Sequence, residues 1–463
     1  MRIASVLSFS AAMALISTHP AVAEPMAITI GGYFTQSVQL VDIDDLGDTT
    51  FEDEVFAQNA EIHFKGKTML NNGTELGIRV ELEASESEDQ IDEHYLYLKG
   101  DWGKLILGAE NGIGHLMQVR APRFVPGLKM FDNSITDDVY ESAYDAHLED
   151  NAIEDAHMST KLEHISGDAN KLSYMTPRVG GLQLGVSYAP NNANRDGGEN
   201  NAGASTDATQ EDIVELGVSY KGMVRGVGYK FSYTGVEGDT VTPNRPKPKS
   251  TSTGLALHYG DWVLGGNISE YDDLSEVYAD GDATDTLYNA RRSITGIGAG
   301  VDWDVDQSIE TSNYALKYKM GDSHIGIGFT EGEETRSISG SIEAPRGDLG
   351  ADGEIDASGS TITSANRDRP ISESFTGGLK TSYEEMMIGY GTKLSPAVSL
   401  GLYYSMSEAE HETMRVTGGT VTDAEAVAGD NNDKPSEISA FNVLTPKSDG
   451  EVSSLGITLN LRF

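Results

Sequence analysis

Apolar side chains recur at every second position over most of this chain, which is the spacing of a β-strand with one apolar face. Residues 60–70 place small or apolar side chains on one face, and the other face carries Glu61, His63, Lys65 and Lys67. A tight-turn signal follows at 71–73, and residues 75–83 then alternate in the same way. The two segments predict an antiparallel pair with one apolar and one charged face.

Short and long connections between such segments alternate along the whole chain. Seven short connections are expected at 71–73, 100–103, 177–181, 221–222, 260–261, 321–322 and 395–396. Eight long ones are expected at 42–56, 86–91, 111–168, 190–211, 234–250, 273–308, 332–372 and 409–450. Short turns at one end and long loops at the other are typical of outer-membrane barrels, in which closure also removes unpaired edges. The pattern predicts an all-β fold, a 16-stranded antiparallel transmembrane β-barrel.

One segment departs from the alternation. Apolar residues lie at odd positions from Phe375 to Tyr383 and at even positions from Met386 to Leu394. The change of phase at Glu384-Glu385 predicts a β-bulge in one long strand. The alternative is an additional hairpin, which would give 18 strands.

The first residues have the order of a secretory signal peptide. Arg2 precedes an apolar stretch, and Ala21-Val22-Ala23 ends it with small residues. We therefore expect residues 1–23 to be a signal peptide and residues 24–463 to form a single barrel domain.

The composition excludes several classes of protein. A formal charge of −40 disfavours binding to the phosphate backbone of nucleic acids, so no nucleic-acid partner is expected. The absence of Cys removes disulfides, thiolate metal sites and Cys nucleophiles. Beyond the first residues no apolar run reaches the length of a membrane helix, whereas a barrel needs apolar residues only at alternate positions.

Several segments together resemble a known family. They are AEIHFKGKTMLNNGTELGIRVELEA, EHYLYLKGDWGKLILGAENG, KLSYMTPRVGGLQLGVSYAP, LSPAVSLGLYYS and the terminal GITLNLRF. In this order they resemble the general porins of Gram-negative bacteria, particularly the alphaproteobacterial type. The resemblance implies an outer-membrane homotrimer that passes small hydrophilic solutes and ions by passive diffusion. It also implies that Phe463 is the assembly signal read by the barrel-assembly machinery.

The resemblance further implies that the third loop, 111–168, folds into the lumen as a constriction with acids facing basic residues of the wall. The candidates on the loop are Asp132, Asp137, Asp138 and Glu141, whose alternative interpretation is a solvated external face. The candidates on the wall are Arg79, His63 and Lys65. Phe124, Val125, Leu128, Met130 and Phe131 are apolar residues that could anchor such a loop. The excess of acids predicts a cation-preferring pore.

Catalytic and cofactor signals are missing from the sequence. It contains no G-x-S-x-G and no H-E-x-x-H, and we expect neither an enzyme nor a bound cofactor. Acidic loops could hold divalent cations weakly, and the basic run 245–249 could contact lipopolysaccharide phosphates or simply be a stiff loop tip. Two alternatives stay open: a substrate-specific porin, and a plugged surface barrel that binds partners through its loops.

Overall fold

A computed structural model describes most of the segments in which strands are expected. The described residues are 26–44, 54–84, 91–128, 160–162, 165–193, 208–241, 247–273, 300–344, 371–411, 415–418, 442–444 and 448–463. The expected signal peptide, residues 1–23, lies outside them.

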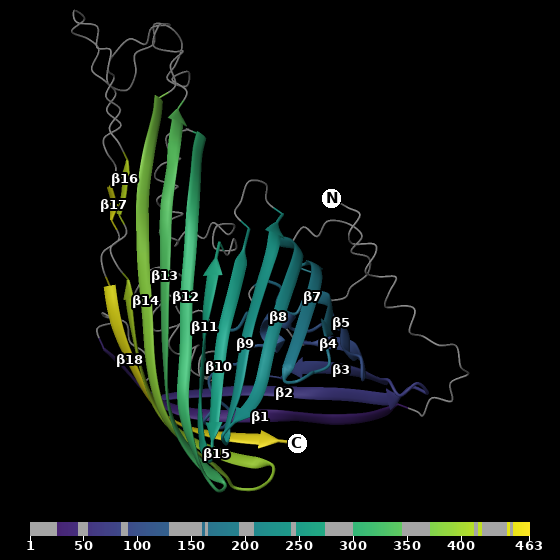
Figure 1. Ribbon diagram of the computed structural model, residues 1–463. Helices are drawn as coiled ribbons and strands as arrows, with labels where there is room; N and C mark the ends of the chain where they lie inside the picture. The colour runs from purple at the N-terminus through teal and green to yellow at the C-terminus, as the bar shows by residue number, and fades with distance from the viewer. Residues whose placement is uncertain are drawn as a thin grey trace, which may run out of the picture.

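The described chain is built almost wholly of β-strands (Figure 1). In chain order they are β1 (Ala27–Asp44), β2 (Glu54–Met69), β3 (Glu75–Glu83), β4 (His94–Gly100), β5 (Gly103–Ala109), β6 (Asn170–Met175), β7 (Leu182–Asn191), β8 (Gln210–Val224), β9 (Val227–Thr240), β10 (Lys249–Tyr259), β11 (Trp262–Asp272), β12 (Gly300–Met320), β13 (Ser323–Ala344), β14 (Ile371–Lys393), β15 (Val398–His411), β16 (Arg415–Gly418), β17 (Asn442–Leu444) and β18 (Ser448–Arg462). A single short helix, α2 (Ile113–Leu116), lies between β5 and β6 among the residues described. None of the described helical residues forms a segment long and apolar enough to cross a membrane.

Sixteen strands close into a ring. Strands β1 to β15 each pair antiparallel with their neighbours in the chain, β15 then pairs with β18, and β18 pairs with β1. The short strands β16 and β17 stand outside this ring, because β16 pairs with β14 beyond the end of β15. The predicted 16-stranded antiparallel barrel is confirmed, and the two short strands extend one side of it rather than widening it.

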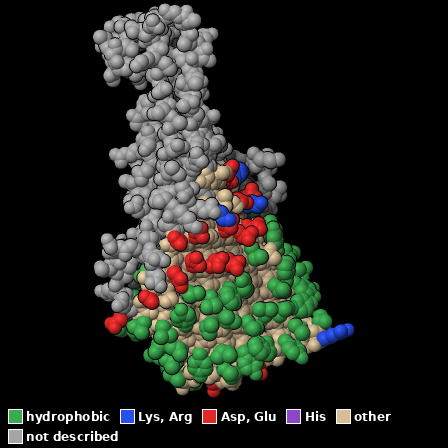
Figure 2. All heavy atoms as spheres, turned by 90° about the vertical axis from the view of Figure 1, so that its left-hand side faces the viewer, with side chains coloured by type: hydrophobic (Ala, Val, Ile, Leu, Met, Phe, Trp, Pro, Cys, Tyr) green, Lys and Arg blue, Asp and Glu red, His purple; other side chains and the backbone are tan. Residues whose placement is uncertain are grey.

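The alternation of side chains places apolar residues outside and small polar residues inside. Leu216 and Ile457 on the outer face are 60% and 51% exposed, whereas Ser232 and Thr458 on the inner face are fully buried. Figure 2 shows the outer residues as a broad apolar band with an acidic belt above it. This is the distribution that a barrel needs in order to face lipid, because only its outer face contacts the hydrocarbon.

The acidic belt follows the strand register. Glu331, Glu384, Glu408 and Glu451 are successive cross-strand neighbours on β13, β14, β15 and β18, and all four are exposed. Carboxylates in this position are hydrated rather than in contact with hydrocarbon. The belt therefore marks the upper limit of the apolar band on this side.

The barrel wall is uneven in height. Strands β3 to β6 have only nine, seven, seven and six residues, whereas β12, β13 and β14 have 21, 22 and 23. In Figure 1 the three long strands rise well above the rest. The long connections expected at 273–308 and 332–372 are correspondingly shorter, because β12 begins at Gly300 and β13 continues to Ala344.

The short turn expected at 221–222 is wrong. Lys221 and Gly222 are still in β8 and pair with β9, and the chain reverses at Arg225-Gly226. These two residues have φ angles of 51° and 85°, which is the left-handed pair that a tight hairpin requires. The strand continues past Gly222 because glycine is compatible with extended backbone, and the residues on both sides of it pair with β9.

The β-bulge expected at Glu384-Glu385 is also wrong. The register of β14 with β13 is unbroken from Ile371 to Thr392, so Tyr383 and Met387 both face inward. Both are fully buried against the inward loop described below. The apparent change of phase arises because this part of the inner wall is apolar, and among the described pairings the register shifts only between Glu211 and Val214.

Candidate pore site

The third long connection enters the barrel directly after β5. Its helix α2 packs against the inner wall of β7 and β8, where Gly185 and Gly217 leave room for Ile113 and Met117. A Cβ on Gly217 would lie 2.8 Å from Cγ2 of Ile113. Ile113 is fully buried, so these two glycines provide the space in which the first part of the loop packs against the wall.

Backbone amides of the loop are bound by side chains of the wall. The amide of Ile113 donates to Oγ of Ser187 at 2.8 Å, and that of Gly114 donates to Oε2 of Glu215 at 2.6 Å. Glu215 is fully buried, and its other carboxylate oxygen accepts a hydrogen bond from Ser166 at 2.5 Å. A buried carboxylate that accepts hydrogen bonds from a loop amide and from Ser166 fixes the position of the start of the loop.

The loop then continues along the inner wall of the barrel. The amide of Val119 donates to Oγ of Ser232 on β9 at 2.7 Å. Further along, the carbonyl of Thr160 accepts hydrogen bonds from Ser269 at 2.7 Å and Asn267 at 3.2 Å on β11. The inner polar side chains of the barrel thus satisfy the backbone groups of the irregular loop where it is buried against the wall.

The far end of the described loop reaches β12 to β18. Phe124 and Val125 fill space over Gly326 and Gly389, and both side chains are buried. Thr458 on β18 donates to the carbonyl of Pro126 at 2.6 Å. The prediction that the third loop folds into the lumen is confirmed for its described part, with Phe124, Val125 and Leu128 as apolar anchors. Met130 and Phe131 lie outside the described residues.

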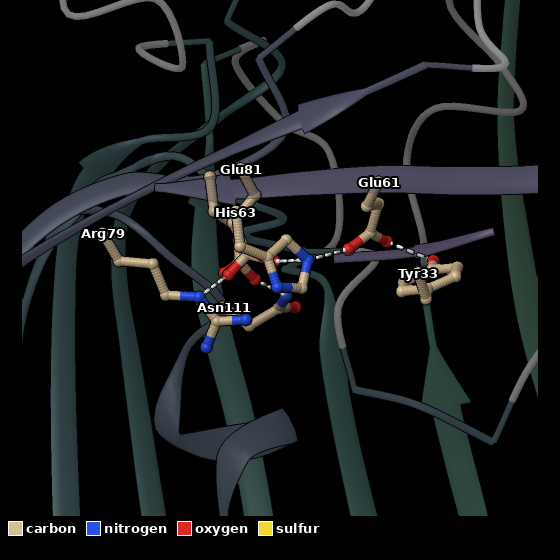
Figure 3. A network of polar contacts seen from close by, with 7 residues as sticks. Tyr33, Glu61, His63, Arg79, Glu81 and Asn111 are labelled. Atoms are coloured by element: carbon tan, nitrogen blue, oxygen red, sulfur yellow. Dashed lines mark hydrogen bonds and ion pairs between the residues drawn. The ribbon is translucent and has the colours of Figure 1, made fainter. Parts of the chain in front are cut away.

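Across the lumen, β2 and β3 carry a charged cluster (Figure 3). Nε2 of His63 lies 2.6 Å from Glu61 and 3.0 Å from Glu81. Arg79 forms an ion pair with Glu81, and the hydroxyl of Tyr33 donates to Glu61 at 2.5 Å. Basic side chains and carboxylates therefore alternate along this wall, and the carboxylate of Glu81 neutralises part of the charge of Arg79.

The structure brings the three predicted wall residues together. Lys65 and Arg79 are direct cross-strand partners, and His63 lies two residues further along β2 on the same inward face. Glu61 and Glu81 were not among the predicted site residues, although they share that face and pair with His63 and Arg79. The four predicted loop residues Asp132, Asp137, Asp138 and Glu141 lie outside the described residues, so their role in the constriction stays a prediction.

Two groups of side chains on this wall could offer ligands to a metal ion. The donor atoms of Glu61, His63 and Glu81 lie within 4.8 Å of one another, as do those of Glu61, Glu83 and Asp92. In the first group Arg79 already binds Glu81. A cation there would have to compete with the guanidinium.

Two neighbouring carboxyl groups, those of Glu93 and Glu110, lie where the third loop leaves the wall. Glu93 precedes β4, and Asn111 donates to it at 3.1 Å. Burial, together with the neighbouring Glu110 carboxylate, raises the pKa of Glu93 to about 8. The amine of Lys171 donates to the backbone carbonyl of Glu110 at 2.8 Å. Burial and the neighbouring carboxylate thus favour the protonated form of Glu93 at the base of the loop.

Basic residues on the opposite wall were missed from the sequence. Strand β12 shows how they could have been found, because Leu316, Tyr318 and Met320 face outward and Lys317 and Lys319 must then face inward. The amine of Lys317 donates to the backbone carbonyl of Arg123 in the loop at 2.7 Å. Basic residues that alternate with outward apolar residues in one strand could therefore have been predicted to face the lumen.

A model of a known protein family matches residues 4–412, nearly the whole chain, and its description is Gram-negative porin. The chain belongs to the Gram-negative porin family. The inward third loop and the closed ring of 16 strands agree with this assignment. As a member of this family, the protein is located in the outer membrane, where it forms a diffusion pore; the family consists of channels rather than enzymes.

Solved structures of low identity are similar in fold. An anion-selective porin from Comamonas acidovorans is 13% identical with a TM-score of 0.47, and the match covers 95% of this chain and 100% of that one. OmpT of Vibrio cholerae, solved in a trimer form, is 11% identical with a TM-score of 0.46 over 95% and 100%. Salmonella typhi OmpF in complex with daunomycin is 12% identical with a TM-score of 0.46 over 94% and 97%. No curated protein matches the sequence, so the family assignment rests on the family model.

Proposed function

We propose that this porin passes small hydrophilic solutes and ions by passive diffusion and prefers cations. The observation that carries the proposal is the third loop, which is hydrogen-bonded to the inner wall from β7 to β18. A loop bound along the wall narrows a barrel while leaving a polar path beside it. Passage then depends on solute size and charge rather than on one tightly fitted ligand.

The preference for cations is supported by the distribution of acids. The chain carries 73 Asp and Glu against 33 Lys and Arg. Acids are concentrated at the end of the barrel that bears the long connections, which in this family faces the outside of the cell, as in the belt of Figure 2. A negative entrance raises the local concentration of cations and lowers that of anions. The predicted acids Asp132, Asp137, Asp138 and Glu141 would add to this effect.

A homotrimer is part of the proposal. Strands β4 and β5 have seven residues each, and at the usual rise and tilt they cover roughly 17 Å of an apolar band that is about 25 Å tall. A wall this low is poorly matched to lipid, and neighbouring copies of the chain would cover it. Cross-linking between copies through residues of β3 and β4 would test the arrangement.

Two further partners belong to the proposal. Phe463 is 65% exposed at the end of the closing strand and exchanges backbone hydrogen bonds with Gly32 at 3.0 and 3.1 Å. An exposed terminal aromatic after alternating apolar residues is suited to recognition by the barrel-assembly machinery. Lipopolysaccharide is the expected lipid neighbour of the outer half of the barrel.

The proposal is tested with the purified protein in liposomes and planar bilayers. Liposome swelling should be fast for small uncharged sugars and slow progressively with sugar size, because a diffusion pore sieves by size. The reversal potential in a salt gradient should have the sign of a cation-preferring pore. Swelling with one solute only would instead support a substrate-specific porin, and no swelling at all would support a plugged barrel.

A further inference from the structure

Seven basic side chains gather on the inner face of neighbouring strands, near the short turns. They are Lys221 on β8, Lys230 on β9, His258 on β10, Lys317 and Lys319 on β12, His324 on β13 and Lys393 on β14. Each lies within four residues of a short turn. We call this set the basic crescent.

The strand register makes the crescent continuous. Lys221 is the direct cross-strand partner of Lys230, and Lys319 is that of His324. His258 and Lys317 lie on either side of Val263 in one row across β10, β11 and β12. Side chains directly opposite each other have Cβ atoms only about 4.5–5.5 Å apart, and diagonal neighbours follow at about 7–8 Å.

The described wall offers the crescent no compensating carboxylate. Among the described inward positions of β8 to β14 near the turns there is no Asp or Glu, and Asp261 and Asp322 are exposed on the turns themselves. No ion pair between described residues involves a crescent lysine, whereas Lys67 on the opposite wall lies 3.9 Å from Glu75. Lys221 and Lys230 are like charges placed directly across a strand pair, and such charges repel each other. The described part of the wall near them provides no carboxylate that would compensate this repulsion.

The crescent also borders the path of solutes. Lys221, Lys230, Lys319 and Lys393 are exposed to the lumen, and Lys317 contacts the third loop through the carbonyl of Arg123. A solute that passes the loop must therefore pass these amines. Because lysine amines on flexible stems can converge on one group from several strands, they suit an oxyanion with more than one negative charge.

We propose that the basic crescent binds small solutes that carry two or more phosphate or carboxylate groups. Such an anion relieves the repulsion between Lys221 and Lys230, which are direct cross-strand partners. The inference deepens the proposed function, because the pore then has an acidic entrance and an anion-binding exit. Binding in a water-filled lumen is screened, so it weakens as the salt concentration rises.

Current block by inorganic triphosphate tests the inference in planar bilayers. The wild-type current should fall as triphosphate is added. In the double variant Lys230→Gln/Lys319→Gln the concentration for half block should rise about ten-fold, because two of the four exposed lysine charges that would contact the anion are removed. The matched control is Lys67→Gln, a lysine already paired with Glu75 near a short turn of the opposite wall, and it should block like the wild type.

A second measurement separates this inference from the proposed function. Equilibrium dialysis of triphosphate against the folded protein in detergent reports binding without current, and heat-shifted electrophoretic mobility reports that each variant is folded. Binding without conductance would contradict the proposed function and leave the crescent intact. Conductance with no block and no triphosphate binding would overturn the inference that the crescent binds anions. An equal loss of block in the double variant and in Lys67→Gln would overturn it as well. Should the double variant fail to fold, Lys393→Gln gives the same comparison with one exposed lysine.

Discussion

Replacement of Phe124 by Ala should release the far end of the third loop from the barrel wall. The ring is only 1% exposed and occupies the space above Gly326 and Gly389, neither of which has a side chain to replace it. Truncation of a buried phenylalanine costs about 3–5 kcal/mol. Since about 1.4 kcal/mol is a factor of ten in an equilibrium, the ratio of docked to released loop should fall by a factor of roughly 10² to 4 × 10³.

The assay is single-channel recording. A loop that leaves the wall more often produces current noise and additional conductance levels above the wild-type one. The matched control is Phe231→Ala, which removes the same ring from the outer face of β9, where it is 39% exposed. Conductance and noise of Phe124→Ala identical to those of the wild type would refute the reasoning that the apolar anchor holds the loop.

Three further changes have defined outcomes. Arg79→Ala removes a cation from the wall and should move the reversal potential toward cation selectivity. Glu93 has a pKa of about 8, above its ordinary value of 4.5, so the folded protein holds a proton that the unfolded chain releases between these values. The free energy of unfolding should therefore fall as pH rises from about 4.5 to about 8, and Glu93→Gln should reduce this dependence in thermal unfolding. Glu215→Leu leaves the amide of Gly114 without its acceptor, which costs about 1–3 kcal/mol and should speed hydrogen exchange of residues 113–117.

Each of these has a control or a contradicting result. Lys247→Ala, an exposed cation outside the barrel wall, should leave the reversal potential unchanged. An unchanged reversal potential in Arg79→Ala would remove that residue from the filter. Unfolding with the same pH dependence in Glu93→Gln and wild type would show that another group titrates. Wild-type exchange rates in Glu215→Leu would mean that the loop does not depend on this carboxylate.

The ring of strands was predictable because it depends on a local signal. Alternation and turn signals specify a strand independently of what it packs against, and lipid outside the barrel keeps the outer pattern simple. The turn at Arg225-Gly226 was missed because Lys221-Gly222 carries a similar signal, and only pairing of the flanking residues decides between them.

The inner face was less predictable because it depends on contacts distant in the sequence. Tyr383 and Met387 are apolar and inward only because a loop about 260 residues earlier in the chain covers them, which misled the register prediction into a bulge. His63, Lys65 and Arg79 were correctly grouped, since adjacent strands in a hairpin fix their register. Their neutralising partners and the basic crescent required the strand pairings themselves.

The measurement that tests the central claim most directly is single-channel conductance of the purified wild-type porin in a planar bilayer. An open barrel narrowed by its third loop should give discrete steps whose current is linear in voltage and rises in proportion to salt concentration. The absence of steps would contradict an open pore, and a conductance that saturates at low salt would contradict general diffusion in favour of a dedicated binding path.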